Sequence, residues 1–304
     1  MEELLSNQYE NNTNTLNRQL HLDKSFDIVA KKLQIGGRKA SLYFVDGLIK
    51  DDVMEKILEF LLSSDGQKLS LCSTPESFCD SFIPYVETEL CPVPATVATQ
   101  VLSGTLALLV EGFSSCIMID ARTYPVRGVQ EPEDDKVLRG SRDGFVETLV
   151  FNTALIRRRI RDPMLTMEYT QIGTVSKTDV VLCYMENKVD REFLEKLRAK
   201  LKTISVRTLS MGQESLAECL IPKQWYNPFP RVRYTERPDC AAACVAEGKI
   251  IVIIDNSPAV MLLPSSFFDF VQDTNDFYFP PMVGTYLRIV RIVVFFLTLF
   301  LTPV

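Results

Sequence analysis

The order of hydrophobic and polar positions along this 304-residue chain follows a similar course twice. Alternating or continuous apolar runs predict strands, and apolar positions spaced three and four apart predict helices. In the first series the predicted elements are strands at 33–35 and 40–45, helices at 51–62 and 95–102, and strands at 105–110 and 116–120. In the second series they are strands at 165–172 and 179–185, helices at 190–201 and 239–247, and strands at 249–254 and 259–263.

Local sequence matches support a duplication behind this repeated order. Residues 104–111 (GTLALLVE) line up with 248–255 (GKIIVIID) at a shift of 248 − 104 = 144, and the QIG at 34–36 returns at 171–173, a shift of 171 − 34 = 137. The alternative is that any two α/β lobes share this periodicity. In either case the sequence predicts an α/β (α+β) fold with two similar ββα…αββ lobes in tandem, followed by the start of a transmembrane helix.

Shifts in composition mark the predicted boundaries of these parts. Residues 1–22 are polar and rich in asparagine, and we expect them to form a disordered tail. The first lobe is expected at 23–121, and a linker with several glycines, prolines and acids at 122–144. The second lobe, with an arginine-rich helix at its start, is expected at 145–280. Residues 285–304 are expected to begin a transmembrane helix that is cut short.

The apolar run at 292–302 is ambiguous, because spanning a bilayer takes about 20 residues and a shorter run also suits a core helix. Two features favour the membrane. The run is apolar on all sides, and Arg288 and Arg291 stand at its N-terminal edge, as expected when the preceding domain is cytoplasmic. The N-terminus shows no signal-peptide pattern. The sequence therefore predicts a cytosolic domain attached to a membrane.

Composition and charge exclude several classes of protein. A formal net charge of −6 argues against nucleic-acid binding, which needs a clustered positive excess. Cysteines in apolar runs, such as Cys116 and Cys183, are expected to be buried free thiols in a reducing compartment. With one histidine, His21, and no Cys-x-x-Cys pair, no metal or other cofactor is expected. Cys240 and Cys244 could share a ligand, or be two small apolar residues on one helix face.

A search for catalytic motifs fails. The chain has no phosphate-binding loop, no dinucleotide-binding glycine pattern, no His-Glu-x-x-His and no Gly-x-Ser-x-Gly. Asp120 and Asp255 stand at strand ends, where α/β enzymes often place carboxylates, but Asp255 lies in a turn sequence and Asp120 has no evident partner. The sequence predicts that the protein is not an enzyme. An enzymatic role would require a pocket lined by paired carboxylates.

The most distinctive segment is an arginine-rich stretch at 139–163 (RGSRDGFVETLVFNTALIRRRIRDP). Asp143 is a candidate N-cap, the acidic Glu147 suits a first turn, the arginines suit a last turn, and Pro163 ends the helix. Its predicted buried face consists of Phe145, Leu149, Ile156 and Ile160.

The arginines of this segment are spread around the helix and cannot all point the same way. Some should pair with acids, and the linker acids Glu131, Glu133, Asp134 and Asp135 are candidates, within the chain or from a neighbouring subunit. A solvated helix end and a phosphate site are the alternatives. The candidate intersubunit or structural residues are Arg139, Arg142, Glu147, Asn152, Arg157, Arg158, Arg159 and Arg161.

A second unusual segment, 225–238 (WYNPFPRVRYTERP), places aromatics between prolines. Such aromatics usually anchor a loop to its own domain, although exposed aromatics and arginines also favour interfaces. The candidate docking residues are Trp225, Tyr226, Phe229, Arg231 and Arg233.

Three segments, 139–163, 227–239 (NPFPRVRYTERPD) and 257–270 (SPAVMLLPSSFFDF), resemble the A-subunit family of spore germination proteins, the GerA family. The likeness extends over nearly everything after the polar tail. Within that family, 42–47 (LYFVDG), 84–87 (PYVE) and the DGFVE at 143–147 look more like a sporulation protein than a germinant-receptor subunit.

The resemblance implies a two-lobed domain on the cytoplasmic, spore-core side of the inner membrane, followed by membrane helices that are absent from this sequence. It implies a homo-oligomeric ion channel, or a subunit of a germinant-receptor complex, with other germination membrane proteins as partners and no catalytic residues. The alternative is a scaffold that docks other germination proteins without forming a pore.

Overall fold

The computed structural model describes residues 4–63, 72, 74–83, 85–124, 143–209, 212–221, 232–266, 269 and 281–301. The chain divides into two compact units. The first consists of Met1–Pro125, Val150–Tyr169 and Met185–Asn187, and the second of Val126–Leu149, Thr170–Tyr184 and Lys188–Val304. The predicted second lobe, 145–280, is therefore too wide, because residues 150–169 cluster with the first unit.

The first sheet contains five antiparallel strands in the order β1-β2-β4-β5-β3. Its strands are β1 (Ile28–Ile35), β2 (Arg38–Val45), β3 (Thr88–Cys91), β4 (Leu106–Val110) and β5 (Cys116–Ile119). Every residue of β4 and β5 is buried, as expected for central strands covered on both faces.

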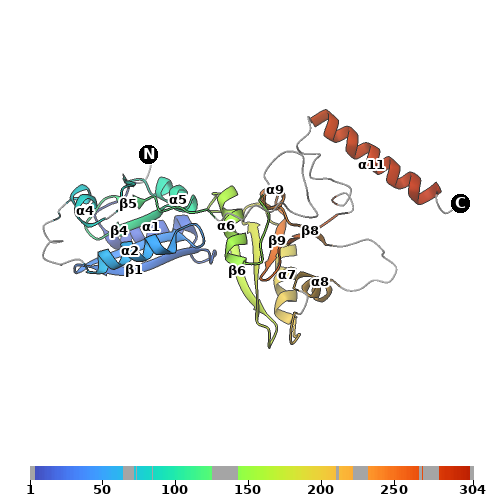
Figure 1. Cartoon of the computed structure of the whole chain (residues 1–304), viewed down its shortest axis with the longest axis horizontal. Helices are drawn as coiled ribbons and strands as arrows, with labels where there is room; N and C mark the ends of the chain where they lie inside the picture. Colours follow the sequence, from blue (N-terminus) through green and yellow to red (C-terminus); the bar gives the residue numbers. More distant parts are fainter. Residues whose placement is uncertain are drawn as a thin grey trace. The chain divides into compact units, whose positions relative to one another are not determined.

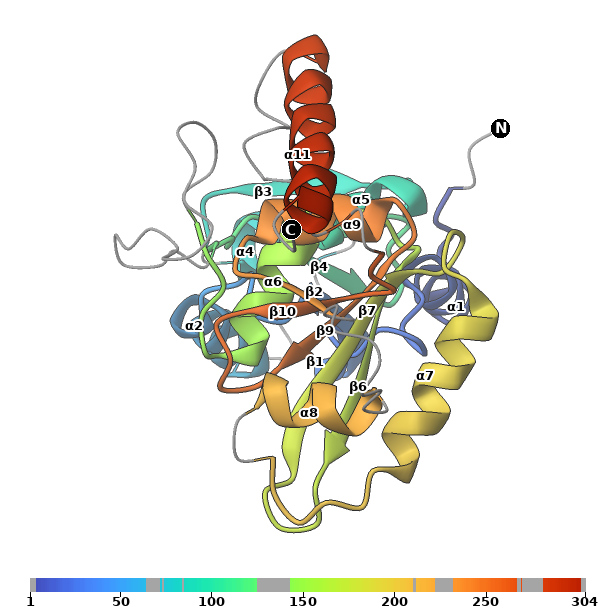
Figure 2. The same cartoon turned by 90° about the vertical axis from the view of Figure 1, so that its right-hand side faces the viewer.

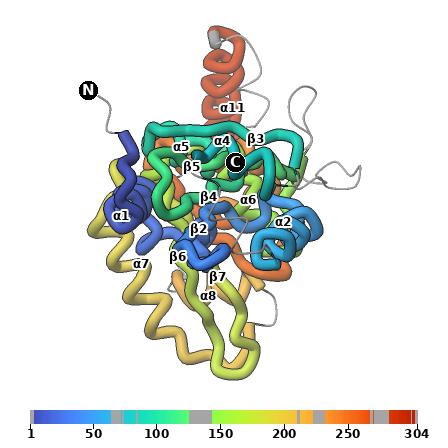
Figure 3. Tube along the Cα trace, turned by 90° about the vertical axis from the view of Figure 1, so that its left-hand side faces the viewer, coloured from blue at the N-terminus to red at the C-terminus, as the bar shows by residue number. Residues whose placement is uncertain are grey.

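Helices cover both faces of this sheet, as Figures 1 and 3 show. Helices α2 (Asp51–Ser63) and α4 (Pro75–Phe82) bury Ile57, Leu61 and Phe78 against one face. Helices α1 (Tyr9–Leu20) and α5 (Pro94–Leu102) bury Leu16 and Val101 against the other. The first unit is thus a three-layer α/β/α arrangement.

The second sheet has the order β6-β7-β9-β10-β8. Its strands are β6 (Leu165–Ile172), β7 (Thr178–Met185), β8 (Arg233–Thr235), β9 (Ile250–Ile254) and β10 (Val260–Leu263). Helices α7 (Arg191–Thr203) and α8 (Gln213–Leu220) pack leucines against one face, and α9 (Pro238–Ala246) contacts β8, β9 and β10 (Figure 2). Asp190 caps α7 by accepting hydrogen bonds from the N–H groups of Glu192 and Phe193.

The two sheets confirm the predicted repeated order. Their strand orders are identical once the numbering is shifted, and the registers agree, since Ala40 faces Val110 and Val180 faces Ile254. Gly104 and Gly248, which the sequence aligns, both have positive φ, +102° and +104°. Only glycine adopts such a conformation without strain, so both lobes need it at the same bend.

The expected disordered tail is wrong, because residues 9–20 form helix α1 with Leu16 and Leu20 fully buried. The buried positions of this helix have amphipathic spacing, but the many asparagines make the segment look polar throughout. The polar Asn12 is itself buried. The equivalent helix of the second repeat is α6 (Leu149–Arg159), since Asn12-Thr13 returns as Asn152-Thr153 at 152 − 12 = 140. Each repeat therefore begins with a helix.

The proline-rich stretches also hold elements that the sequence pattern does not predict. Pro75 begins α4, where the absent N–H is tolerated, and Thr74 accepts a hydrogen bond from the N–H of Ser77 at 3.3 Å. Strand β3 and, in the second repeat, α8 and β8 were likewise not predicted. Most of the predicted linker, 125–142, lies outside the described residues.

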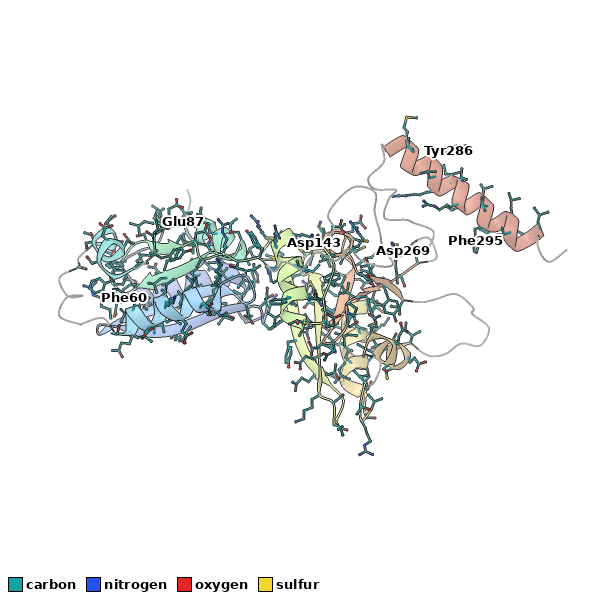
Figure 4. The ribbon with its side chains drawn as sticks, viewed as in Figure 1. Phe60, Glu87, Asp143, Asp269, Tyr286 and Phe295 are labelled. Carbon is teal, nitrogen blue, oxygen red and sulfur yellow. The ribbon has the colours of Figure 1, made fainter. Side chains whose placement is uncertain are left out.

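Helix α11 (Pro281–Leu301) contains the apolar run at the end of the chain. Arg288 and Arg291, the predicted membrane edge, lie within this helix and are half-buried. Among the described residues, no helix combines the length and apolar character needed to cross a membrane. Figure 4 shows the α11 side chains, with Tyr286 and Phe295 labelled.

Candidate functional site

Helix α6 begins later than the sequence predicts. Asp143 and Glu147 precede its first residue, Leu149, so neither the predicted N-cap nor the predicted first-turn acid lies within the helix. In the second unit, the Leu149 N–H donates instead to the Asp255 carboxylate at 3.2 Å. Asp255 therefore does more than form a turn, because it accepts from an N–H group at the start of this helix.

The predicted buried face of this segment is correct for most positions. Phe145, Leu149 and Ile156 are buried, and Ile160, just after the helix, is half-buried. Asn152 is also fully buried, which its polar side chain did not suggest. Glu147 is exposed, while its carbonyl accepts from the N–H of Asn256 at 2.8 Å. Arg139 and Arg142 lie outside the described residues.

Arg157 is the centre of a buried polar cluster in the first unit. Its side chain is 0% exposed, and that of its partner Asp27 is 2% exposed. The guanidinium binds the carboxylate in a fork, with Nε to Oδ2 at 2.8 Å and Nη2 to Oδ1 at 3.0 Å. This bidentate geometry is the one that favours arginine over lysine.

The two terminal guanidinium nitrogens also donate to other groups of the first unit. Nη2 reaches the Leu165 carbonyl at 3.1 Å and the Ser25 hydroxyl at 3.2 Å, and Nη1 reaches the Asp162 carbonyl at 3.2 Å. The Ser25 hydroxyl accepts in turn from the N–H of Met167 at 2.9 Å. Arg157 thus fastens the end of α6 to the segment before β1 and to the start of β6, all within the first unit.

The sequence predicts that some arginines of this segment pair with acids, and Arg157 does so. The acid is Asp27, 130 residues earlier, and the proposed linker acids lie outside the described residues. All three guanidinium nitrogens donate to groups of the same chain, and the side chain is 0% exposed, so it does not face solvent where a phosphate could bind. In the described structure, Arg157 therefore contacts groups of its own unit.

The remaining arginines of the helix lie nearer the surface. The Arg158 guanidinium stacks over the Tyr124 ring, 4.1 Å from its centroid, and Arg161 donates to the Tyr124 hydroxyl at 3.5 Å. Arg159 donates to the Leu155 carbonyl at 3.0 Å. Arg158 and Arg161 are exposed, so these two, not Arg157, can meet a partner.

Most of the predicted docking loop, with Trp225, Tyr226, Phe229 and Arg231, lies outside the described residues. Arg233 is half-buried in β8, opposite Leu262 of β10.

Sequence reasoning missed Arg237, near the end of the same segment. Its side chain is 1% exposed and grips Asp239 with Nε to Oδ1 at 3.1 Å and Nη2 to Oδ2 at 2.6 Å. The sequence pattern that could have predicted this ion pair is an arginine and an aspartate on either side of Pro238, the first residue of α9.

A polar groove of about 350 Å³ in the first unit bears on the enzyme hypothesis. Three carboxylates line it, those of Glu87, Glu89 and Asp120, together with Arg122 (Glu87 is labelled in Figure 4). Asp120 does have a partner, contrary to expectation. Hydrogen bonds from Arg122, including Nε to Oδ1 at 2.6 Å, lower the pKa of the Asp120 carboxyl despite partial burial. A carboxylate held ionised in its own ion pair is a poor general acid.

Cys116 and Cys183 were predicted to be buried free thiols, and both are free and 0% exposed. Burial raises the pKa of the Cys116 thiol, which keeps it protonated and unreactive. Cys240 and Cys244 are half-buried. Within the described ranges, His, Cys, Asp and Glu side chains form no cluster of three or more that could hold a metal ion.

Comparison with known proteins places these features in a family. A sequence profile described as "Bacillus/Clostridium GerA spore germination protein" matches residues 14–304. Stage V sporulation protein AF of Bacillus subtilis (strain 168) is 39% identical over 270 residues, 88% of this chain and 54% of that protein. This agrees with the predicted likeness to a sporulation member.

Two further matches define how far the likeness reaches. Spore germination protein KA of the same organism is 26% identical over 278 residues, 90% of this chain and 51% of that protein. The chain thus spans about half the length of these curated relatives. The crystal structure of the N-terminal domain of the A subunit of the Bacillus megaterium spore germinant receptor GerK3 has the same fold, with a TM-score of 0.64, 24% identity, and coverage of 88% of this chain and 98% of that one. The chain therefore belongs to the GerA family of spore germination proteins.

Proposed function

We propose that this chain is the two-lobed N-terminal part of a spore-germination membrane protein. The whole protein would act as a subunit of an oligomeric ion channel or germinant-receptor complex in the spore inner membrane, with the lobes on the core side. The observation that carries this proposal is the family match along residues 14–304, with 39% identity to a sporulation protein. One relative, 29% identical over 91% of this chain, is named a membrane protein, YfkQ of Bacillus subtilis.

Attachment to a membrane is supported by the surface of α11. Most apolar side chains of this helix are exposed, among them Ile289, Val293, Leu297 and Phe300. Exposed apolar surface of this extent marks a contact with lipid or with another protein. In the full-length protein we expect this helix to lie against the membrane or the remaining membrane-embedded part.

An oligomeric role can use the exposed side of α6. Phe151 is 47% exposed, and Arg158, seven residues later, lies on the same face of the helix. Exposed aromatics and arginines on one face are typical of interface centres. We propose that this face contacts a neighbouring subunit, while Arg157 holds the helix in place from within.

Photo-crosslinking in spores tests the assembly. A photoreactive amino acid replaces Arg158 in the full-length protein, and a matched control carries it at Glu59, an exposed position of α2. We expect crosslinked multimers of the protein from position 158 and far fewer from position 59. Crosslinks from 158 only to other germination proteins would instead favour a scaffold without a pore.

Ion flux tests the channel itself. Full-length protein is reconstituted into liposomes with the germination proteins that co-purify with it, and release of an encapsulated cation is followed. Flux that depends on the protein supports the channel. A monomeric protein that passes no ions with its partners present would rule it out.

A further inference from the structure

The second unit has an apolar groove between α7 and α8. It has a volume of about 560 Å³, and its walls are formed by Phe193, Leu197, Leu220, Ile221, Leu263 and Pro264. Leu197, Leu220 and Leu263 belong to the core of this unit, so the groove opens onto the edge of that core. Its volume lies within the usual range for small-molecule sites, roughly 300 to 1,000 Å³.

Two lysines stand over this apolar surface. Lys196 and Lys200, one helical turn apart on α7, line the groove and are exposed. Lys200 Nζ donates to the Leu220 carbonyl at 2.9 Å, and Lys196 Nζ lies 2.5 Å from Glu192 Oε1 in an exposed pair. An ammonium has three donors, so both lysines retain donors for a further anion, and an exposed ion pair is weak enough to exchange.

The chemistry of the groove decides what can fill it. Inorganic phosphate could use only the two ammonium groups and gains nothing from the apolar wall, and a nucleotide would place its polar base and sugar against that wall. A docked protein helix would need an interface of more than about 1,000 Å², which a groove of this size does not supply. An acyl chain fits the wall, and an acidic head group fits the two ammonium groups.

We propose that the α7–α8 groove binds the single acyl chain of an anionic amphiphile taken up as a monomer, of the long-chain fatty-acid class. The chain lies along Phe193, Ile221 and Pro264, the less buried apolar residues of the groove, and the carboxylate is held by Lys196 and Lys200. Binding of an acyl chain in this groove does not require the whole protein to be a channel.

The test uses a long-chain fatty acid that carries a photoreactive diazirine, below its micelle concentration, with labelled peptides identified by mass spectrometry. Mapping the site matters because exposed apolar residues of α11 can also take up such a probe. We expect labelling in the α7 and α8 peptides that an excess of plain fatty acid removes. A neutral methyl ester should compete at least tenfold less well.

Two variants separate shape from charge. Ala199→Trp fills the groove from an exposed position that lines it, and the double variant Lys196→Glu/Lys200→Glu reverses its charge. Each should lower α7–α8 labelling at least tenfold. Lys202→Glu, on the same helix but outside the groove, is the matched control and should change it less than twofold.

Circular dichroism confirms that each variant is folded. Labelling confined to α11, or labelling of the groove that is equal in all variants, would overturn the proposal by showing that the probe partitions onto any apolar surface. Equal competition by the methyl ester would overturn the role of the lysines.

Discussion

Helices α2 and α7 occupy the same place in the two repeats, yet their outer surfaces are opposite in charge. Their inner positions correspond at a shift of 140, with Ile57 and Leu61 of α2 matching Leu197 and Leu201 of α7. On the outside, α2 carries four acids and one lysine, whereas α7 carries five cations and two acids. The packing of the sheet constrains the inner face, whereas the outer face is free to acquire a different partner.

The helices that open each repeat differ in a similar way. Arg157 of α6 aligns with Asn17 of α1, which accepts a hydrogen bond from the Tyr43 hydroxyl at 3.2 Å. Asp27, the partner of Arg157, precedes β1, and the position before β6 that corresponds to it is Met164. The buried ion pair therefore exists once and is not a property of the duplicated fold.

Removing Arg157 should have the largest effect on this contrast. Arg157→Met leaves the Asp27 carboxylate buried without its guanidinium, and we expect the first unit to lose about 3–5 kcal/mol of stability. Amide hydrogen exchange in β1 and β2 measures this loss locally, which suits a chain with two units. Asn17→Ala, at the equivalent place in the first repeat, should lose only about 1 kcal/mol.

Two further variants separate charge from packing. Arg158→Met, an exposed neighbour on the same helix, should lower stability by no more than about 1 kcal/mol, the contribution of its contact with the Tyr124 ring. The double variant Asp27→Leu/Arg157→Met should recover much of the loss, because no charge is then left buried. If the single and double variants were equally unstable, the ion pair would not be the cause.

The sequence predicted most of the strands, but not β3 and β8, because the signals of the others are local apolar runs. Apolar runs such as Leu106–Val110 and Ile250–Ile254 are too continuous to be anything but central elements, and the aligned Gly104 and Gly248 mark their starts. Helix α1 was missed because Asn12 and Thr13 count as polar in any periodicity, although both are buried. Comparison with Asn152 and Thr153 would have revealed it.

The site was only partly predictable, for a different reason. The four arginines within residues 157–161 look equivalent in sequence, and only the fold brings Arg157 to Asp27, 130 residues away. The exposed lysines of α7 give no sign of a groove in the sequence, because α8 and the end of β10 complete it, and periodicity does not place these elements beside α7. A single sequence does not show which residues far apart along the chain pair in the fold.

The two aligned glycines offer a smaller test of how alike the repeats are. A Cβ at Gly248 would lie 2.8 Å from the Lys188 carbonyl oxygen, whereas at Gly104 it would meet side-chain atoms of Leu48 and Arg122 at 3.1 and 3.2 Å. Backbone cannot yield as a long side chain can. We expect Gly248→Ala to destabilise the second unit by about 2–4 kcal/mol and Gly104→Ala the first by about 1–2 kcal/mol, from strain at positive φ and crowding.

Hydrogen exchange in β9 for Gly248→Ala and in β4 for Gly104→Ala provides the measurement. Equal losses of stability in the two variants would mean that strain at positive φ, and not crowding by the neighbouring backbone, determines the destabilisation. A larger loss at Gly104 would contradict the packing described for the two sites.

Acid sensitivity gives the smallest expected difference between the units. Burial raises the pKa of the Asp269 carboxyl, but hydrogen bonds from Lys249 at 2.6 Å and from the Ser266 N–H at 2.7 Å outweigh it, so the pKa is lowered overall. A carboxyl with a lowered folded-state pKa adds stability above its unfolded value, near 4, and this is lost as the pH falls through the folded value. Between pH 6 and pH 2.5, Asp269→Asn should therefore lose roughly 0.5–1 kcal/mol less stability in the second unit than the unmodified chain.

Asp120→Asn should show the corresponding change in the first unit, because Arg122 lowers the pKa of the Asp120 carboxyl. Exchange measured in β10 for one variant and in β5 for the other reports each unit separately. A variant whose loss on acidification matched that of the unmodified chain would show that its carboxylate gains nothing from its cation. If only Asp269→Asn gave that result, Lys249 would stabilise the Asp269 carboxylate no more than water does in the unfolded chain. Arg122 would still stabilise the Asp120 carboxylate in the folded first unit.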